Sequence, residues 1–463
     1  MPTAKPNKDT KKSAPGKFVQ KEAPGEEVLE KAPKALREDL QSPKGMRDLI
    51  GDDWYLYQGF FEKAAEIALY YGFKPIETPI LEKETLFNRG VGQGTDIVEK
   101  EMYTLKTRGG DKLTMRPEGT APVMRAYFEH GMQAQPQPLM LYYYGPYFRH
   151  ENPQSGRYRQ FYQFGLEILG TPKPIADATI IRLFKTILDE AGIPDVRVLI
   201  NSIGDAACRG AFRRELINYY RKNSRAICPD CRERLKTNPL RVLDCKDPRC
   251  QEIKKNAPES ISFLCEDCKK HFKEVLEYLE KMGINYEIDN SLVRGLDYYS
   301  RTVFEVFSTI PGENGEPATT LALGGGGRYD YLAKALGSKR DVQSVGGGLG
   351  VDRIVSMPQY AKHAPRIVKK PKVFFIQLSF DAKLRSFEII EVLRHAHIPV
   401  AHSISKDSLG SQLAIAERLK IPYTIILGQK EALDSTVIVR NMESRSQETI
   451  KIDKLAEYLK QLK

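Results

Sequence analysis

Three arginines stand close together in one short polar stretch of the chain. Arg149, Arg157 and Arg159 lie within or beside the stretch HENPQSGRYR, which separates two apolar runs, LYYYGPYF and QFYQFGLEIL. The planar guanidinium of arginine holds phosphate or carboxylate oxygens through two parallel hydrogen bonds. The spacing therefore predicts a site for an anionic, phosphate-bearing ligand, and an exposed basic hairpin without a ligand is the alternative.

The two apolar runs must position these arginines. Both runs alternate in the manner of β-strands, and a proline and a glycine punctuate the stretch between them. The pattern predicts a hairpin over residues 141–170. Gln163 and Glu167 are four residues apart, so on a strand their side chains face the same side. With Glu151 in the loop, they place polar groups beside the arginines, and a carboxylate there suits a small cation next to a phosphate.

A second candidate site lies in the stretch RPEGT, residues 116–120. It falls where a short strand predicted over 112–116 meets a helix predicted over 119–128. A carboxylate and a hydroxyl at such a corner can hold the ammonium group of a ligand. The same two residues, Glu118 and Thr120, can instead cap the helix, because side-chain oxygens accept hydrogen bonds from its first free N–H groups. The sequence leaves both interpretations open.

Three glycine-containing stretches carry further candidates. LVRGLDYYS gathers Arg294, Tyr298 and Tyr299 in one bend, where a cation and flat rings can hold one ligand. GGGGRYD places Tyr329 after four glycines, which let the backbone approach a ligand closely. SVGGGLGVDRIV runs from a strand of small residues into a helix with Arg353, and it lacks the GK[ST] of a P-loop. Such a strand can stack under a base while Arg353 reaches a terminal phosphate.

Six of the seven cysteines crowd between residues 228 and 268. Two C-x2-C pairs, CPDC and CEDC, can present four thiolates to Zn²⁺ in a tetrahedron. Cys245 and Cys250 lie between these pairs and are alternative ligands, and cysteines are also common as buried residues without a metal. The preferred zinc ligands are the cysteines of the two pairs: Cys228, Cys231, Cys265 and Cys268.

The composition restricts the class of protein. The 463-residue chain has a net charge of +11 and a pI near 9.0, which favours a polyanionic partner such as nucleic acid. No apolar run approaches the ~18 residues that span a membrane, and the N-terminus has no apolar signal core. An odd number of cysteines argues against a disulfide framework and for a reducing compartment, the cytoplasm. Residues 1–40 are rich in Lys, Pro, Ala and Glu and predict a disordered tail.

The remaining chain shows three kinds of pattern. A helix predicted over 52–71 is followed by a proline-containing strand over 73–81, which must lie at an edge or interface and can pair with a second subunit. A helix over 174–191 and a strand over 196–200 follow the hairpin. After a basic, proline-punctuated linker, a β-α-β-α pattern of about 90 residues predicts a separate α/β domain that serves binding.

Together these stretches resemble the class II aminoacyl-tRNA synthetases, and specifically the histidyl-tRNA synthetase family, over about residues 42–463. The helix and proline strand of 52–81 are similar to motif 1, FRHENPQSGRYRQFYQ to motif 2 and GGGLGVDRIV to motif 3. LVRGLDYYSRTVFEV and GGGGRYD are similar to the family's two histidine-specific stretches. The resemblance implies an α+β catalytic domain on a mostly antiparallel sheet, a small helical insertion domain and a C-terminal α/β anticodon-binding domain. The implied boundaries are 41–204 with 289–358 for the catalytic domain, 205–288 for the insertion domain, 359–371 for the linker and 372–463 for the anticodon-binding domain.

The resemblance also implies an activity and a role for each candidate residue. The activity is ATP-dependent ligation of L-histidine to tRNA(His) through histidyl-adenylate, with Mg²⁺, by a cytoplasmic homodimer. Arg149 and Arg294 would be the catalytic cations at the α-phosphate. The ATP-binding residues would be Arg149, Glu151, Arg294 and Arg353. The histidine-binding residues would be Glu118, Thr120, Arg149, Gln163, Glu167, Arg294, Tyr298, Tyr299 and Tyr329.

Two rival functions and one local prediction stand beside this resemblance. One rival is a pure RNA-binding zinc module, which would not need the full set of arginines and pocket residues. The other is a synthetase-like regulatory subunit that binds histidine without ligase activity. Such paralogues usually lack the anticodon-binding domain and part of the arginine set, whereas both are expected here. A zinc site is not a general feature of the family, so the zinc prediction rests on the cysteines alone.

Overall fold

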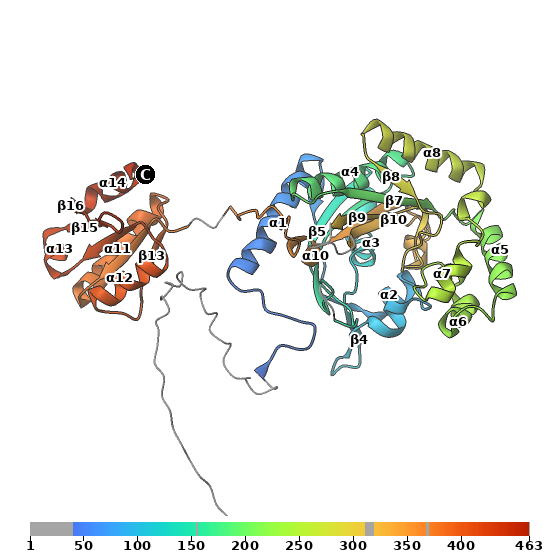
Figure 1. Cartoon of the computed structure of the whole chain (residues 1–463), viewed down its shortest axis with the longest axis horizontal. Coiled ribbons are helices and arrows are strands. Elements are labelled where there is room, and N and C mark those ends of the chain that lie inside the picture. Colours follow the sequence, from blue (N-terminus) through green and yellow to red (C-terminus); the bar gives the residue numbers. More distant parts are fainter. Residues whose placement is uncertain (1–39, 154–155, 311–318, 367–369, 463) are drawn as a thin grey trace, which may run out of the picture. The chain divides into compact units, whose positions relative to one another are not determined.

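The computed structural model of the chain describes residues 40–153, 156–310, 319–366 and 370–462 (Figure 1). The tail predicted for residues 1–40 lies outside these ranges except for its last residue, as do residues 154–155 of the arginine-bearing loop. Within the described ranges, no helix has both the length and the apolar character needed to span a membrane.

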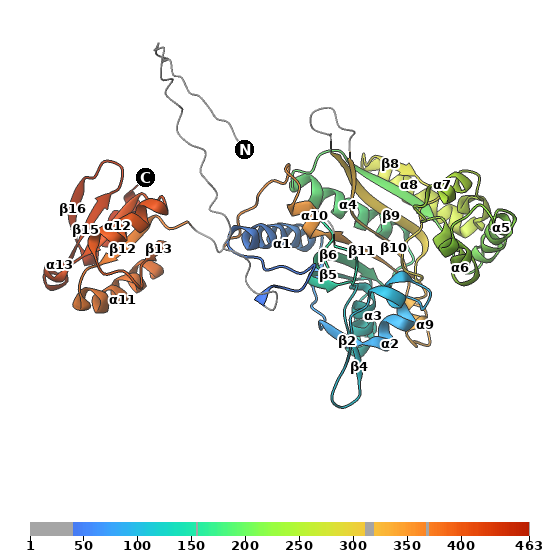
Figure 2. The same ribbon diagram turned by 60° about the horizontal axis from the view of Figure 1, so that its bottom comes forward.

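The body of the structure is an eight-stranded, mostly antiparallel sheet (Figure 2). Only the outermost pairs, β1 with β5 and β7 with β8, run parallel. The predicted hairpin is confirmed as two strands of ten residues each, β5 and β6. In spatial order the strands are β1 (Lys74–Pro75), β5 (Leu139–Phe148), β6 (Gln160–Leu169), β11 (Ser344–Gly350), β10 (Thr319–Arg328), β9 (Ser300–Ile310), β7 (Val196–Ser202) and β8 (Tyr286–Ile288).

Helices cover both faces of this sheet, because each face is apolar. On one face α1 (Asp52–Tyr70), α4 (Pro174–Glu190) and α8 (Glu266–Lys281) pack through buried residues such as Phe60, Phe184 and Leu279. A second core, which includes Val123 and Leu332, lies under α2 (Glu84–Gly90), α3 (Thr120–Glu129) and α9 (Leu332–Ala335). The short helix α10 (Val351–Val355) follows β11 directly, as predicted for SVGGGLGVDRIV. Two single turns, η2 (Ile97–Glu101) and η3 (Met132–Ala134), connect these elements.

The strand predicted over 73–81 is wrong in its length. Only β1 pairs with the main sheet, at its edge, while β2 (Leu81–Lys83) belongs to a separate small sheet with β4 (Lys112–Met115) and β3 (Thr104–Lys106). Pairing with the main sheet ends at Ile76, whose N–H donates to Tyr142 O at 2.9 Å, and Pro79, which lies between the two pieces, has no N–H to donate.

Residues 205–288 are mostly helical. Helices α5 (Arg209–Lys222), α6 (Pro229–Thr237) and α7 (Pro248–Lys254) gather around a small core of their own, as Figures 1 and 2 both show. Two 3-10 turns, η4 (Pro239–Val242) and η5 (Ser260–Phe263), connect them to one another and to α8. Phe212, Leu216 and Tyr220 from α5 form this core with four buried cysteines.

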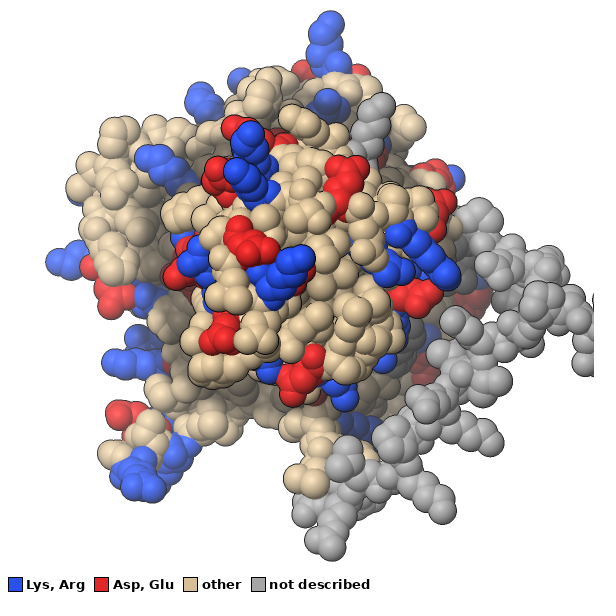
Figure 3. All heavy atoms as spheres, turned by 90° about the vertical axis from the view of Figure 1, so that its left-hand side faces the viewer, with Lys and Arg blue, Asp and Glu red and all other residues tan. Residues whose placement is uncertain are grey.

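The C-terminal part is a five-stranded sheet with helices. Its strand order is β13-β12-β14-β15-β16, in which the first three strands run parallel and the last two antiparallel. The face of this part turned to the viewer in Figure 3 carries basic and acidic side chains intermixed with uncharged ones, rather than a field of one sign. Its elements are β12 (Val373–Gln377), α11 (Phe380–His395), β13 (Val400–His402), α12 (Leu409–Arg418), β14 (Tyr423–Leu427), α13 (Gln429–Asp434), β15 (Thr436–Asn441), β16 (Gln447–Lys451), η7 (Ile452–Lys454) and α14 (Leu455–Gln461).

A buried ion network joins the sheet to the helices above it. Arg328 at the end of β10 is fully buried, and its Nη2 lies 2.8 Å from Oδ2 of Asp177 on α4. Asp330 Oδ1 accepts a second hydrogen bond from Arg328 Nη1 at 3.1 Å, and His271 Nε2 of α8 lies 3.3 Å from Asp177 Oδ1. Burial alone would raise the pKa of Asp177, but the charge of Arg328 and the hydrogen bond with His271 hold that pKa below its usual range.

Replacing Arg328 by methionine is expected to lower the free energy of unfolding by about 3–5 kcal/mol, because two buried carboxylates lose their partner. Since the pKa of Asp177 is depressed in the folded protein, the network stabilises the fold above pH about 4 and the difference between the two proteins should shrink below it. Urea denaturation across pH measures both effects. Arg197→Met is the control, because Arg197 pairs with Asp195 at the surface; an Arg328 variant no less stable than this control contradicts the prediction.

Candidate active site

A cavity of about 630 Å³ lies beside the hairpin. Its size suits a nucleotide with a small second substrate, since small-molecule sites occupy roughly 300–1,000 Å³. The walls come from elements far apart in the sequence, including the hairpin loop, the glycine-rich strands and the helical residues 205–288. The predicted site residues that line it are Arg149, Glu151, Gln163, Arg294 and Arg353.

The cavity arginines are held in place mainly by backbone carbonyls. Arg149 Nε donates to Pro117 O at 2.9 Å, and Arg353 donates to Gly156 O at 3.3 Å and to Ala322 O at 2.5 Å. Because carbonyls are neutral, these hydrogen bonds fix the guanidiniums without cancelling their charge. Two of these arginines also lie near a carboxylate: Arg149 Nη1 is 4.0 Å from Glu151 Oε1, and Arg294 Nη1 is 3.3 Å from Glu305 Oε1.

Arg353 is the least compensated of these cations. Burial, and then the like charge of Arg157, lower the pKa of its guanidinium. Within the ranges that the structure describes, no carboxylate lies within ion-pair distance of Arg353. A bound anion would relieve this uncompensated charge, which makes the environment of Arg353 suitable for a phosphate.

The three arginines of the loop do not share one role. Arg157 lines the cavity with Arg149, and its Nη1 lies 3.5 Å from Glu151 Oε2. Arg159 instead donates to the carbonyl oxygens of Glu151, at 3.1 Å, and Lys44, at 3.4 Å. Arg159 therefore braces the loop, and two of the three predicted ligand arginines face the cavity.

The glycine stretches form a flat floor for the cavity. Gly325 pairs with Gly348 and Gly326 with Gly347 across β10 and β11. A Cβ atom on Gly347 would lie 2.6 Å from the carbonyl oxygen of Gly325, and one on Gly325 would lie 2.7 Å from Arg294 Nη1. The close approach of the two strands, and of the arginine to one of them, therefore requires glycine at these positions.

A second group of polar residues lies beside the cavity, around Glu167. This carboxylate is fully buried and accepts hydrogen bonds from three hydroxyl groups. Thr120 donates to Oε1 at 2.8 Å, Tyr143 donates to the same oxygen at 3.0 Å, and Tyr329 donates to Oε2 at 2.6 Å. Burial raises the pKa of Glu167 to about 8, although the hydroxyl donors oppose the shift. A carboxyl in this setting is poised to change its protonation state when a ligand binds.

Glu118 takes the helix-capping role that the sequence left open. Its two oxygens accept hydrogen bonds from the backbone N–H groups of Thr120, at 2.7 Å, and Ala121, at 2.9 Å, at the start of α3. Tyr298 adds a third hydrogen bond at 3.2 Å, and its ring packs 4.7 Å from that of Tyr299. The predicted histidine-binding residues thus fall in two places: Arg149, Gln163 and Arg294 on the cavity wall, and Glu118, Thr120, Glu167, Tyr298, Tyr299 and Tyr329 in the buried cluster.

Sequence reasoning missed two residues of this region. Tyr143 holds Glu167, and its strand position directly opposite Gly165 brings its hydroxyl there. Glu305 lines the cavity and pairs with Arg294. Glu305 is the single charged residue in the otherwise apolar strand sequence TVFEVF, and this was the feature that could have identified it as a site residue.

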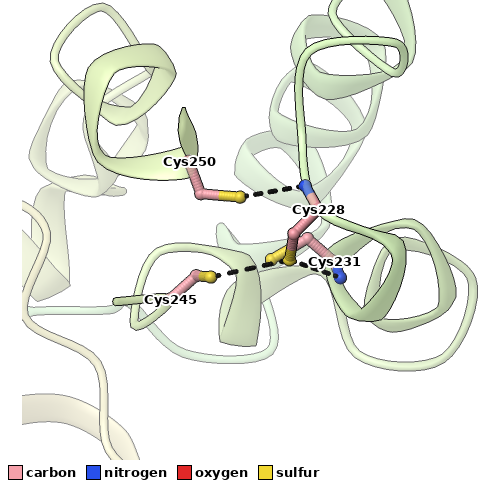
Figure 4. Close-up of side chains that lie close together, drawn as sticks. All are labelled: Cys228, Cys231, Cys245 and Cys250. Atoms are coloured by element: carbon pink, nitrogen blue, oxygen red, sulfur yellow. Dashed lines mark hydrogen bonds between the residues drawn. The ribbon is translucent and has the colours of Figure 1, made fainter. Parts of the chain in front are cut away.

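The predicted zinc set of Cys228, Cys231, Cys265 and Cys268 is wrong, because the structure separates its two halves. Cys228 and Cys231 lie with Cys245 and Cys250, all four buried and with Sγ atoms within 4.8 Å of one another (Figure 4). Figure 4 shows these side chains converging from α6, α7 and the loop between them. The helical core places Cys245 and Cys250 over the first pair, so the second C-x2-C pair belongs to a different group.

Comparison with known proteins identifies relatives that match about nine-tenths of the chain. Residues 45–354 match the family model of histidyl-tRNA synthetase, and residues 372–462 match that of an anticodon-binding domain. A histidine–tRNA ligase of Caldicellulosiruptor bescii is 38% identical over 91% of this chain and 99% of its own length. One of Dehalococcoides mccartyi is 41% identical over 90% of this chain and 98% of its own. The solved apo histidyl-tRNA synthetase of S. aureus matches with a TM-score of 0.74 at 32% identity, covering 91% of this chain and 100% of that one.

Proposed function

The chain belongs to the histidyl-tRNA synthetase family, and on that premise we propose that it ligates L-histidine to tRNA(His) at the expense of ATP. The observation that carries the proposal is the meeting of Arg149, Arg294 and Arg353, from three distant stretches, on one cavity. The matched anticodon-binding domain supports the ligase over a histidine-binding regulatory subunit.

In the first step the carboxylate of histidine attacks the α-phosphorus of ATP. A bond forms between the carboxylate oxygen and phosphorus, and the bond to the leaving pyrophosphate breaks. Two anions must approach each other, so cations fixed beforehand lower the barrier. We assign Arg149 and Arg294 to the α-phosphate and Arg353 to the γ-phosphate. The backbone anchors of Arg149 and Arg353 support this assignment, because they leave the positive charge available.

Two carboxylates on the cavity, Glu151 and Glu305, fit Mg²⁺, which takes oxygen ligands from carboxylates and phosphates. Both now pair with arginines, Glu151 with Arg157 and Arg149, and Glu305 with Arg294. We propose that they would hold Mg²⁺ against the ATP phosphates, where the ion would neutralise charge on the departing pyrophosphate.

In the second step a terminal ribose hydroxyl of tRNA attacks the carbonyl carbon of the adenylate, and AMP leaves. This step needs the end of a polyanion beside the adenylate, so much of its rate should come from positioning. Lys246 and Lys254, from residues 205–288, line the same cavity and support an approach of tRNA from that side. The glycine floor suits the adenine and ribose, because Gly324 and Gly350 on the cavity wall have no side chains of their own.

The test of the proposed function is histidine-dependent ATP–pyrophosphate exchange by pure protein, followed by charging of tRNA(His). The ligase should show both, and other amino acids should not support exchange. Histidine binding without exchange would favour the regulatory subunit, and absence of both would remove the proposal.

We propose the same domain boundaries as the sequence predicted: 41–204 with 289–358, then 205–288, 359–371 and 372–463. The ranges matched by the two family models and the helical content of residues 205–288 support them. A cytoplasmic location is supported by the cysteines, which are free thiols among the described residues.

We also propose a homodimer that forms through α1 and the residues after it. Large apolar side chains are exposed along α1 and the residues after it, and Tyr70 is 86% exposed at the end of α1. Trp54, Leu69, Ile80 and Leu81 add to the group. Exposed apolar patches of this kind are typical of protein interfaces.

Replacing Leu69 and Tyr70 together by aspartate is expected to raise the dimer dissociation constant about a hundredfold, because two exposed apolar side chains of the proposed interface become charged. Sedimentation equilibrium measures the change. Leu433→Asp is the control, since Leu433 is 79% exposed but lies on α13 in the C-terminal part. An unchanged dimer in the double variant would show that this face is not the interface.

The group Cys228, Cys231, Cys245 and Cys250 is proposed as a structural Zn²⁺ site. The Sγ atoms of Cys228 and Cys245 lie 3.8 Å apart, close to the spacing of two thiolates about 2.3 Å from one tetrahedral zinc ion. Cys231 N–H donates to Cys228 Sγ at 3.4 Å, and Cys228 N–H donates to Cys250 Sγ at 3.2 Å. Cys231→Ser is expected to remove about one zinc per chain, measured by elemental analysis, and unchanged zinc content would exclude these ligands.

A further inference from the structure

A second buried cluster of possible metal ligands lies apart from the four-cysteine group. Cys208, Cys265 and Cys268 lie with Asp205, and the ligand atoms of all four are within 4.8 Å of one another. We propose that this cluster is a second zinc site, formed by three thiolates and one carboxylate. It accounts for the three cysteines that the first group leaves over, so all seven cysteines of the chain become metal ligands.

The spacing of the ligands matches a zinc site. Two residues separate Asp205 from Cys208, and two separate Cys265 from Cys268. The cluster therefore consists of one Asp-x2-Cys pair and one Cys-x2-Cys pair, each with the spacing of a zinc half-site. The Sγ atoms of Cys208 and Cys268 lie 3.8 Å apart, the same distance as between Cys228 and Cys245. A disulfide would require about 2.0 Å. Zinc accepts thiolate and carboxylate ligands together, whereas Mg²⁺ and Ca²⁺ prefer oxygen alone.

The backbone around the cluster is shaped for a sulfur ligand. Asp205 N–H donates to Cys208 Sγ at 3.4 Å, as Cys231 N–H does to Cys228 in the first group. Gly204 has a φ of +69°, and a Cβ atom there would lie 2.6 Å from Cys208 Sγ. Glycine at 204 thus keeps the space that the sulfur occupies. Three of the four proposed ligands are at least nine-tenths buried, and Cys265 is half-buried.

The carboxylate ligand has a partner that orients it. Arg301 Nη2 lies 3.1 Å from Asp205 Oδ2, while Oδ1 accepts a hydrogen bond from Ala207 N–H at 3.0 Å and faces Cys208 Sγ at 3.6 Å. Ligating carboxylates are commonly fixed in this way by a hydrogen-bond donor outside the metal's own ligands. Three thiolates, a carboxylate and Zn²⁺ carry a net charge of −2, which Arg301 and the neighbouring Arg209 can balance.

The cluster joins the two ends of the helical insertion to the catalytic sheet. Asp205 follows β7, Cys208 precedes α5, and Cys265 and Cys268 begin α8. Arg209 donates hydrogen bonds to the carbonyl oxygens of Gly204 and Tyr299, and Arg301 N–H donates to Gly204 O at 2.8 Å. A metal ion here would therefore fix the segment that carries Tyr298 and Tyr299 in the buried cluster around Glu167.

Zinc binding requires the loss of one proton from each thiol, so the site would release about three protons per ion bound, since Asp205 is already ionised in its pair with Arg301. No oxidant or reductant takes part. The ion would cross-link the segments that carry its ligands, and none of these four ligands lines the cavity.

The test is the zinc content of the full-length protein, purified without chelator and measured by elemental analysis. We expect about two zinc ions per chain in the unaltered protein, about one in Cys268→Ser, about one in Cys231→Ser and none in the double variant. Asp205→Cys is the matched variant, and it should keep two zinc ions. After exchange of zinc for Co²⁺, its thiolate-to-cobalt absorption should be about one seventh stronger, because the two sites then hold eight thiolates instead of seven. Asp195→Cys, on an exposed loop residue, is the control and should leave that absorption unchanged.

One zinc ion per chain in the unaltered protein, lost in Cys231→Ser and retained in Cys268→Ser, would overturn the second site. If Cys268→Ser does not fold, titration of the unaltered protein with a thiol-blocking mercurial decides: release of two zinc ions supports the site and release of one refutes it. These measurements need neither histidine nor ATP, so their outcome is separate from that of the proposed ligase activity. A selective rise in KM for histidine in folded Cys268→Ser, with KM for ATP unchanged, would locate the effect at Tyr298 and Tyr299.

Discussion

Replacing Arg294 by alanine is expected to lower histidine-dependent ATP–pyrophosphate exchange about a thousandfold, because a preorganised cation at the reacting phosphate contributes at this level. Arg294 lines the cavity, lies against the glycine floor beside Gly325 and pairs with Glu305. The loss should appear in kcat more than in KM for histidine, since the charge develops during transfer. Burst kinetics of adenylate formation, measured at saturating ATP over a range of histidine concentrations, separates the effect on kcat from the effect on KM for histidine.

The alanine variant also leaves Glu305 without its partner, so a second variant is needed. Arg294→Lys keeps a positive charge beside Glu305 and leaves this proposed Mg²⁺ ligand in place, and exchange should stay low if the planar guanidinium acts on phosphate. Recovery to within about tenfold of the unaltered protein would show that Arg294 serves only to neutralise Glu305. Arg197→Ala, which removes an exposed arginine of a surface pair, controls for the general effect of losing a positive charge.

Replacing Glu167 by glutamine is expected to lower kcat/KM for histidine by roughly ten- to a hundredfold, which corresponds to the roughly 1.5–3 kcal/mol of a hydrogen bond to a charged group. The change keeps the size of the side chain, and rotation of the Tyr329 hydroxyl can satisfy the new amide. The loss of exchange activity in Glu167→Gln should be smaller when the ATP concentration is limiting than when the histidine concentration is limiting. Equal losses for the two substrates would contradict a role in the histidine pocket.

Histidine binding is expected to release a proton from Glu167. Because burial raises the pKa of Glu167 to about 8, its carboxyl holds a proton at pH 7 in the free protein. An imidazole N–H donated to it favours the ionised form, so histidine binding should release a proton below pH about 8 and no longer do so above it. Calorimetry in two buffers of different ionisation enthalpy measures the proton, and Glu167→Gln should show none from this source. Tyr458→Phe, in the C-terminal part, is the control.

The hairpin and the glycine strands could be predicted from local pattern, because alternation and glycine runs depend on neighbours in the sequence. Tyr143 could not. Three tyrosines follow one another in LYYYG, and only the pairing of Tyr143 with Gly165 decides which hydroxyl reaches Glu167. Register is set by partners elsewhere in the chain, so a side chain chosen by register is invisible to a local pattern.

The cysteines show the same limit at a larger distance. A C-x2-C pair identifies half of a metal site, but the other half is chosen by the packing of helices. Cys245 and Cys250, rather than Cys265 and Cys268, pack against the first pair. The partner of the second pair is Asp205 with Cys208, which has the spacing of a half-site but begins with a carboxylate, so a search for paired cysteines does not reveal it.

The glycine floor bears on how this enzyme can diverge. At Gly324 and Gly347 an added Cβ would strike backbone carbonyl oxygens of the facing strand. Every residue type has such an oxygen, so no substitution on the facing strand can make room for the Cβ. The hairpin loop and the wall around Glu167 are made of side chains and can exchange size and charge. Substitutions that change substrate preference are therefore expected in those two walls. The floor is expected to stay glycine, because backbone atoms of the facing strand leave no room for a side chain.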